Sequence, residues 1–198
     1  MRTIPRLATE RLVLRPFRRV DADEFARLAG DWAVASMTSD IPYPFSAAQA
    51  MGWLKPVRGE VRFGVELDGQ LIGGVGFYRR ASGVAELGFW LGRPWWGNGY
   101  ATEAARAVIH HGFANPRLPA FSSAHFTDNR ASEQVLAKLG FQPTGRASIA
   151  CAARQCDVEV VTYWLDRQHA SAENAGQKER PAGQVARWRA WLSLFGGT

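Results

Sequence analysis

The 198-residue sequence is poor in several kinds of residue, and each shortage excludes a class of protein. Its two cysteines, Cys151 and Cys156, are too few for a disulfide framework, and no apolar run approaches the ~18 residues of a membrane span. The first residues, Met1-Arg-Thr-Ile-Pro-Arg6, lack the apolar core of a signal peptide. We therefore expect one globular domain in a reducing cytoplasm, without a membrane partner.

Lysine is also scarce, since the chain has 3 lysines against 21 arginines and a formal net charge of +6. A positive charge is compatible with nucleic acid, a polyphosphate cofactor or an acidic protein surface. The arginines gather only in small groups, such as Arg18-Arg19 and Arg79-Arg80. This dispersion argues against a nucleic-acid partner.

Motifs for metals and nucleotides are missing as well. There is no His-Glu-x-x-His, and the two cysteines lack the companions of a zinc site, so we expect no metal. Gly97-Asn-Gly99 lacks the third glycine of a dinucleotide fingerprint, and the chain has no Walker A lysine. NAD and ATP are therefore disfavoured as cofactors.

The most informative stretch is a glycine-containing loop at residues 93–99 that leads into a helix. An apolar segment, Ala85-Glu-Leu-Gly-Phe-Trp-Leu91, precedes it and predicts a buried strand. Gly97 and Gly99 allow the backbone to turn tightly, and the free N–H groups of the following helix favour an anion. We interpret this stretch as a pyrophosphate site, with a dinucleotide site and a purely structural turn as the alternatives.

The remaining pattern predicts an α+β fold with a mixed, mostly antiparallel sheet. Helices are expected from Asp21 or Asp23 to Ala29, after Ser46, over 101–113, and from Asp128 or Asn129 to Leu139. Expected strands are 9–15, 62–67, 70–78, 84–91, 121–126, 145–153 and 157–165, with Asp68-Gly69 as a hairpin turn.

Two regions have unusual composition. Residues 31–60 are rich in large side chains without a clean period, which is typical of packing over a sheet or of a substrate pocket. The domain is expected to end near residue 168. A polar linker is predicted at 169–183, and 184–198 form an amphipathic segment that docks on the domain, stays disordered, or contacts a partner.

Three motifs in order resemble the GNAT superfamily of acyl-CoA-dependent N-acetyltransferases, most closely its RimJ/RimL-type group. They are Thr9-Glu-Arg-Leu-Val-Leu-Arg-Pro-Phe17, the strand and glycine loop at 85–104, and residues 128–141. The resemblance covers roughly residues 6–166. It implies helices flanking the central sheet, in which a splayed strand pair holds acyl-CoA, and an acetyl-CoA cosubstrate without a metal.

The resemblance also implies particular binding residues. Backbone groups would hold the pantetheine arm and the pyrophosphate, and the residues concerned are Phe89, Trp90, Leu91, Trp96, Gly97, Asn98, Gly99, Tyr100, Ala101, Thr102, Asn129 and Ser132. Two positions depart from the superfamily pattern. Pro94 replaces a usual Gln or Arg, and Leu136 replaces a tyrosine that protonates the departing thiolate in many members.

The chemistry requires a base for the amine and an acid for the thiolate. Glu86 is our candidate base, and its alternative role is a structural pair with Arg79 or Arg93. Ser132 is our candidate acid, and its alternative role is a hydroxyl that satisfies the helix start. His125 is either near the thioester or a core histidine. Glu103 is interpreted as a favourable charge in the first helical turn.

The function implied is transfer of acetyl to a primary amine, either a protein N-terminus or a small molecule, by direct attack in a ternary complex. The alternative is a catalytically silent acyl-CoA-binding sensor. Glu66, Glu86 and Asp157 are candidates for an acidic acceptor pocket. The closing hairpin and the aromatic C-terminal segment are candidate surfaces for a homodimer.

Overall fold

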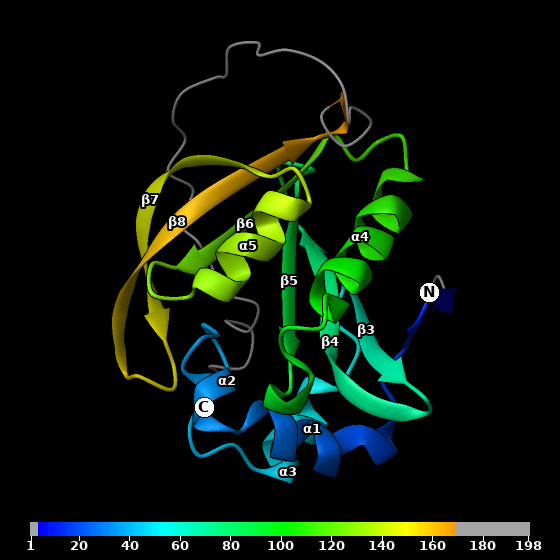
Figure 1. The fold of residues 1–198 in the computed structure, drawn as a ribbon, viewed down its shortest axis with the longest axis vertical. Helices are drawn as coiled ribbons and strands as arrows, with labels where there is room; N and C mark the ends of the chain where they lie inside the picture. The colour runs from blue at the N-terminus through cyan, green and yellow to red at the C-terminus, as the bar shows by residue number, and fades with distance from the viewer. Residues whose placement is uncertain (1–3, 169–198) are drawn as a thin grey trace.

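A computed structural model describes residues 4–168, so the predicted linker at 169–183 and the amphipathic segment at 184–198 lie outside the described residues. The described chain forms an eight-stranded sheet in the order β1-β2-β3-β4-β5-β6-β8-β7 (Figure 1). The strands are β1 (Leu7–Ala8), β2 (Val13–Arg15), β3 (Glu60–Leu67), β4 (Gln70–Arg79), β5 (Ala85–Leu91), β6 (Ala120–Phe126), β7 (Gln142–Cys151) and β8 (Cys156–Asp166).

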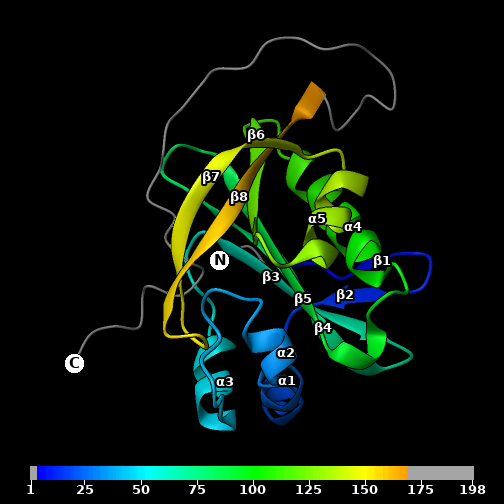
Figure 2. The same ribbon diagram turned by 60° about the vertical axis from the view of Figure 1, so that its left-hand side comes forward.

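Helices lie on both sides of this sheet, as Figure 2 shows. The α-helices of residues 4–168 are α1 (Ala22–Ala29), α2 (Trp32–Ala35), α3 (Ala47–Trp53), α4 (Tyr100–Phe113) and α5 (Arg130–Lys138). One apolar cluster joins α4 and α5 to the sheet, with Phe121 and Leu136 fully buried in it. A second cluster joins α1, α2 and α3 to the other face, around Phe25. The predicted α+β architecture is confirmed.

Most of the predicted elements are present, and local chemistry explains their boundaries. Asp68 (φ 49°) and Gly69 (φ 81°) both adopt the left-handed backbone that a two-residue hairpin turn requires. Ser46 caps α3 and Asn129 caps α5 through side-chain oxygens. The pattern missed β1 and α2, which are only two and four residues long. Such short elements have too few residues to show a period.

The sheet opens between β5 and β6, which form its parallel strand pair. Their register contains only Ala85 opposite Phe121 and Glu86 opposite Ser122. The next contact is a hydrogen bond from Ser123 Oγ to the Leu87 carbonyl at 3.1 Å. Beyond it, β5 continues against β4 and β6 against β8. The splayed strand pair expected from the sequence is therefore present, and it exposes the backbone edge of β5 from Gly88 onward.

Within residues 4–168, no helix is both long and apolar enough to cross a bilayer. The same part of the chain contains no group of three or more His, Cys, Asp or Glu side chains that could hold a metal ion.

Candidate functional site

A cavity of about 130 Å³ occupies the opening between β5 and β6. One side is formed by residues 86–90 of β5 and the other by residues 123–126 of β6. Asn129 and Ser132 of α5 line it, and residues 37–41, Trp53, Ile149 and Val160 close it on the remaining sides. The cavity therefore joins the two predicted catalytic residues, Glu86 and Ser132, in one space.

The predicted pyrophosphate loop follows β5 at the edge of this opening. Gly97 (φ 79°) and Gly99 (φ 80°) both adopt left-handed conformations, which explains why glycine occupies these positions. Gly99 is the N-cap of α4 and its cap has no side-chain hydrogen bond, so the first amides of α4 stay available to an anion. The Trp96 indole N–H donates to the Leu91 carbonyl at 2.7 Å, so this carbonyl already has a hydrogen-bond partner within the protein.

Glu103 connects this loop to the N-terminal hairpin. Its carboxylate accepts from the Thr9 hydroxyl at 2.6 Å, the Arg11 backbone N–H at 2.8 Å and the Arg11 guanidinium at 2.7 Å. Arg11 also donates to the Asn98 carbonyl at 3.0 Å and lies 4.6 Å from the Tyr100 ring centroid. Arg11 therefore holds the loop through the backbone carbonyl of Asn98.

The Glu103 network gives that residue a role beyond a favourable helix charge. Burial alone would raise the pKa of Glu103, but the hydrogen bonds from Thr9 and Arg11 lower it below its ordinary value. A carboxylate with this many donors is held ionised. Its role in the loop is structural, as the sequence interpretation expected, although Arg11 was not recognised as its partner.

Glu86 lies at the root of the opening, where β5 and β6 are still paired. Its side chain is 13% exposed and forms an ion pair with Arg80. The arginine pair of the alternative structural interpretation is therefore present, but the partner is Arg80 and not Arg79 or Arg93, because the chain turns at 81–83 and brings Arg80 back over β5. Burial raises the pKa of Glu86 above its ordinary value, and Arg80 opposes only part of that shift.

Ser132 lies in the first turn of α5 and faces the cavity. Its backbone N–H donates to Asn129 Oδ1 at 3.1 Å, so the helix start is capped by Asn129. The Ser132 hydroxyl makes no hydrogen bond to another residue in the described chain, which leaves it available to a ligand. Leu136 is fully buried in the core, and no hydroxyl replaces the family tyrosine at that position.

His125 is a core histidine. The residue is 6% exposed, and its Nδ1 lies 2.7 Å from the Phe126 carbonyl, so Nδ1 must be the donor. Nε2 lies 3.1 Å from the Tyr163 hydroxyl and accepts from it when the ring is neutral. Because both nitrogens have partners, His125 has no free proton to offer the cavity.

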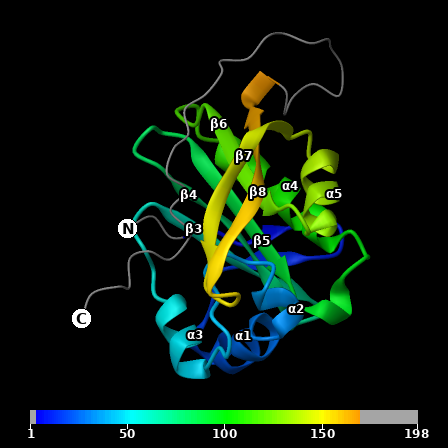
Figure 3. The same ribbon diagram turned by 90° about the vertical axis from the view of Figure 1, so that its left-hand side faces the viewer.

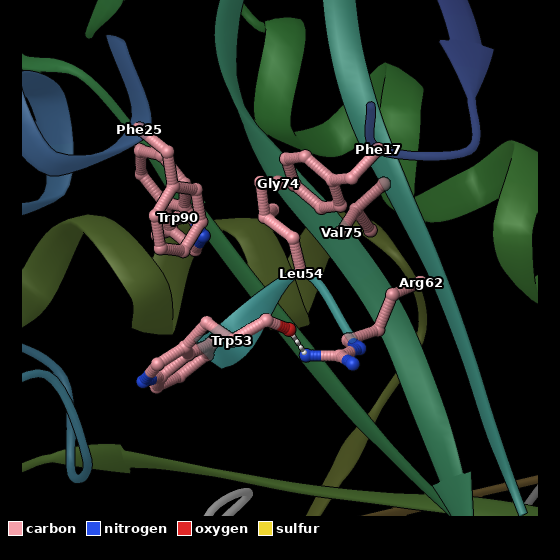
Figure 4. Close-up of a pocket in the computed structure, with 8 residues that line it drawn as sticks. All are labelled: Phe17, Phe25, Trp53, Leu54, Arg62, Gly74, Val75 and Trp90. Carbon is pink, nitrogen blue, oxygen red and sulfur yellow. Dashed lines mark hydrogen bonds between the residues drawn. The ribbon is translucent and has the colours of Figure 1, made fainter. Parts of the chain in front are cut away.

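Phe25, Trp53 and Trp90 form an aromatic wall beside the cavity, and Figure 4 shows these side chains around a second, smaller space. Trp53 and Trp90 line both the cavity and a space of about 10 Å³ beside Phe25. That space holds one water molecule at most. The Arg62 guanidinium donates to the Trp53 carbonyl and fixes this end of α3. The cavity therefore ends at the aromatic wall.

The structure separates the predicted acidic residues. Glu66 binds Arg15 at 2.6 Å, on β3, away from the cavity. Asp157 lies near the tip of the last hairpin and does not line the cavity either. The carboxylates that do line it are Glu86 and Asp40. Of the three candidates for an acidic acceptor pocket, only Glu86 lines the cavity, and sequence reasoning missed Asp40, which belongs to the irregular 31–60 segment.

Comparison with known proteins shows the family and the fold. A family model described as an acetyltransferase (GNAT) domain matches residues 11–142. The uncharacterized N-acetyltransferase YoaA of Bacillus subtilis is 34% identical over 151 residues, which cover 71% of this chain and 85% of that protein. A GNAT-family acetyltransferase from Bacillus anthracis has a TM-score of 0.73 at 22% identity, covering 83% of this chain and 99% of that one.

Mycobacterium smegmatis RimJ, solved in complex with CoA-disulfide, has a TM-score of 0.70 at 20% identity and covers 83% of this chain and 88% of that one. The mixed sheet with its parted parallel strands thus has the fold of known acetyltransferases. Since the family model spans 132 of the 198 residues (11–142), the chain belongs to the acetyltransferase (GNAT) family. It is an N-acetyltransferase by that membership and by its similarity to YoaA.

Proposed function

We propose that this chain is a RimJ/RimL-type N-acetyltransferase that moves the acetyl group of acetyl-CoA to a primary amine in a ternary complex. The observation that carries the proposal is the single cavity that contains Glu86 at the root of the parted strands and Ser132 at the start of α5. A base for the amine and an acid for the thiolate are thereby provided on two sides of one space.

The residues present fit acetyl-CoA, which supplies the activated acetyl group. The uncapped amides of α4 and the left-handed glycines suit a pyrophosphate, and the free edge of β5 at Phe89 and Trp90 suits the amide-bearing pantetheine arm. Asn129 lies beside that arm in this proposal. Crystals of the structurally similar RimJ contain CoA-disulfide, which supports the same cofactor class here.

Glu86 is proposed to remove the ammonium proton of the acceptor, through water. Its raised pKa brings it nearer to neutral pH, where a base is most effective. Ser132 is proposed to donate a proton to the departing thiolate, and backbone N–H groups near Trp90 to stabilise the developing oxyanion. Orientation of the two substrates in the cavity supplies most of the remaining rate enhancement.

The acceptor side of the cavity combines two carboxylates with apolar surface. Asp40 adds a carboxylate beside the pair of Glu86 with Arg80, and Met37, Ile41 and Trp53 favour an apolar body next to it. A primary amine on an apolar carrier therefore fits best, whether at a protein N-terminus or in a small molecule. A homodimer through the closing hairpin stays a prediction.

The test is release of free thiol from acetyl-CoA with a panel of primary amines: phenylethylamine, spermidine, kanamycin and a hexapeptide with a free N-terminus. We expect turnover with at least one amine, and a loss of about 100-fold in kcat for Glu86→Gln while the acetyl-CoA Kd stays within about threefold. Glu159→Gln, which changes an exposed carboxylate of β8, is the control. Tight acetyl-CoA binding without any turnover would instead establish the silent sensor.

A further inference from the structure

The tip of the last hairpin clamps the segment that follows α2. Figure 3 shows β7 and β8 running down toward the helices at the lower end of the sheet. The Ala152 N–H donates to the Ser39 carbonyl at 2.7 Å, and the Cys151 thiol lies 3.3 Å from the Thr38 carbonyl. Residues 151–154 thus hold residues 36–39, which are 113 to 118 positions away along the chain.

Arg154 also contacts this segment, and it reaches further residues as well. Its Nε donates to the Ser36 carbonyl at 2.6 Å, and one guanidinium nitrogen lies 3.3 Å from Met37 Sδ. Another guanidinium nitrogen pairs with Asp128 at 2.8 Å, and the guanidinium carbon lies 5.1 Å from the centroid of the Phe126 ring. One side chain therefore joins the hairpin tip, the segment after α2 and the turn between β6 and α5.

The partners of Arg154 belong to the cavity, although Arg154 does not line it. Met37 and Phe126 are cavity residues, and Asp128 directly precedes Asn129, which lines the cavity and caps α5. The guanidinium therefore contacts Met37 in the acceptor-side wall, which is formed by residues 37–41. Its other partner, Asp128, directly precedes Asn129 on the proposed cofactor side.

We infer that Arg154 is a positioning residue that sets the acceptor-side wall and links it to the start of α5. The inference rests on the proposed acetyltransferase function. The wall needs such support, because α2 has only four residues and is too short to be stable alone. Gln155, next to Arg154, is a non-glycine residue in the disfavoured left-handed region at φ 54°, and its N–H donates to the Cys151 carbonyl at 2.8 Å.

The arrangement specifically requires arginine. Its planar fork reaches three partners at once, whereas the single ammonium of lysine reaches one of them. Arg154 is 20% exposed in its side chain, and its partner Asp128 is 52% exposed. Asp128→Asn therefore breaks one arm of the contact at the surface without opening the core.

The test compares Arg154→Met and Arg154→Lys with the wild type in three measurements. For the amine that wild type acetylates best among phenylethylamine, spermidine, kanamycin and the hexapeptide, we expect kcat/KM to fall at least about tenfold in both variants. The acetyl-CoA Kd should change by less than about threefold. In hydrogen exchange of the acetyl-CoA-bound full chain, amides of 36–41 and 127–129 should exchange at least about tenfold faster.

Arg146→Met is the matched control, because Arg146 lies on the same hairpin in an ion pair with Glu159 and is 67% exposed. It should leave kcat/KM, the acetyl-CoA Kd and the exchange rates within about twofold of wild type. Asp128→Asn should accelerate exchange at 127–129 more than at 36–41. In the double variant with Arg154→Met, the further increase in exchange caused by Asp128→Asn should be smaller than the increase it causes alone.

The two proposals fail in different ways. If wild type acetylates no amine but exchange rises at both segments in Arg154→Met, the positioning inference stands and the proposed function falls. If Arg154→Met matches Arg146→Met in exchange and in kcat/KM, the positioning inference is wrong. Full rescue by Arg154→Lys would also overturn it, since charge alone would then suffice.

Discussion

Two carboxylates flank the parted strands. Their side chains are similarly exposed, but their pKa values shift in opposite directions. The side chain of Glu103, on the loop side, is 15% exposed, and that of Glu86, at the cavity, is 13% exposed. Yet the pKa of Glu103 is lowered and the pKa of Glu86 is raised. Two causes explain the difference: hydrogen bonds from Thr9 and Arg11 outweigh burial at Glu103, whereas Glu86 is surrounded by more protein and burial outweighs its partner Arg80.

The two sides of the opening also differ in the contacts that hold them in place. The cofactor loop takes its shape from contiguous residues, and Arg11 and Glu103 only brace it. The acceptor wall has little regular structure of its own and depends on the hairpin tip around Arg154. We therefore expect changes near the loop to affect cofactor affinity, and changes at the wall to affect the acceptor.

The largest effect on the cofactor side is expected for Gly99→Val. A β-branched residue strongly disfavours a φ of 80°, so the loop must move and the acetyl-CoA Kd should rise about tenfold or more. Isothermal titration with acetyl-CoA measures this. Gly69→Val is the control, since Gly69 has φ 81° and open space around its Cβ position but lies in a distant hairpin. Equal losses of affinity in both variants would contradict the assignment of the loop.

A smaller effect is expected for Arg11→Met, which removes the brace while leaving the glycine conformations in place. The acetyl-CoA Kd should rise about fivefold, or about 1 kcal/mol, and kcat at saturating acetyl-CoA should stay nearly unchanged. Arg27→Met is the control, because the exposed pair of Arg27 with Glu24 touches neither side of the opening. A loss in kcat without a change in Kd would place Arg11 in the chemistry and break the comparison.

The third effect, of similar size at pH 7 and smaller in acid, is a pH-dependent difference in stability. Because the folded-state pKa of Glu103 is lowered, its contribution is present above its ordinary pKa of 4.5 and is lost as pH falls through the folded value. Glu103→Gln should therefore cost about 1 kcal/mol at pH 7 in urea unfolding and progressively less in acid. Glu86 has the opposite sign, since its raised pKa makes its contribution largest below pH 4.5 and lost as pH rises. A cost of Glu103→Gln that grows in acid would contradict this assignment.

The features that could be predicted from the sequence are those that depend on residues close together along the chain. The loop at 93–99, the caps Ser46 and Asn129, and the Asp68-Gly69 turn each depend on a short stretch, so propensity and spacing sufficed. The sheet opening was predicted by resemblance to a family. Local pattern does not explain why β5 and β6 separate after two residue pairs.

The contacts that could not be predicted join distant segments. Arg11 and Asn98 are 87 positions apart, and Arg154 and Ser36 are 118. Nothing in the spacing of arginines distinguishes Arg80 from Arg79 as the partner of Glu86, because that choice depends on the geometry of one turn. Asp40 was missed for the same reason, since it is one polar residue in a segment without a period.

The central claim is that Glu86 is a buried base with a raised pKa and Glu103 is an ionised brace. The pH profile of kcat/KM for the amine that wild type acetylates best tests it most directly. Wild type should lose activity as pH falls through a pKa above 4.5, and Glu103→Gln should keep that limb. Glu86→Gln should lose it, leaving only the ionisation of the amine. An acidic limb unchanged in Glu86→Gln, or one that disappears in Glu103→Gln, would contradict the assignment.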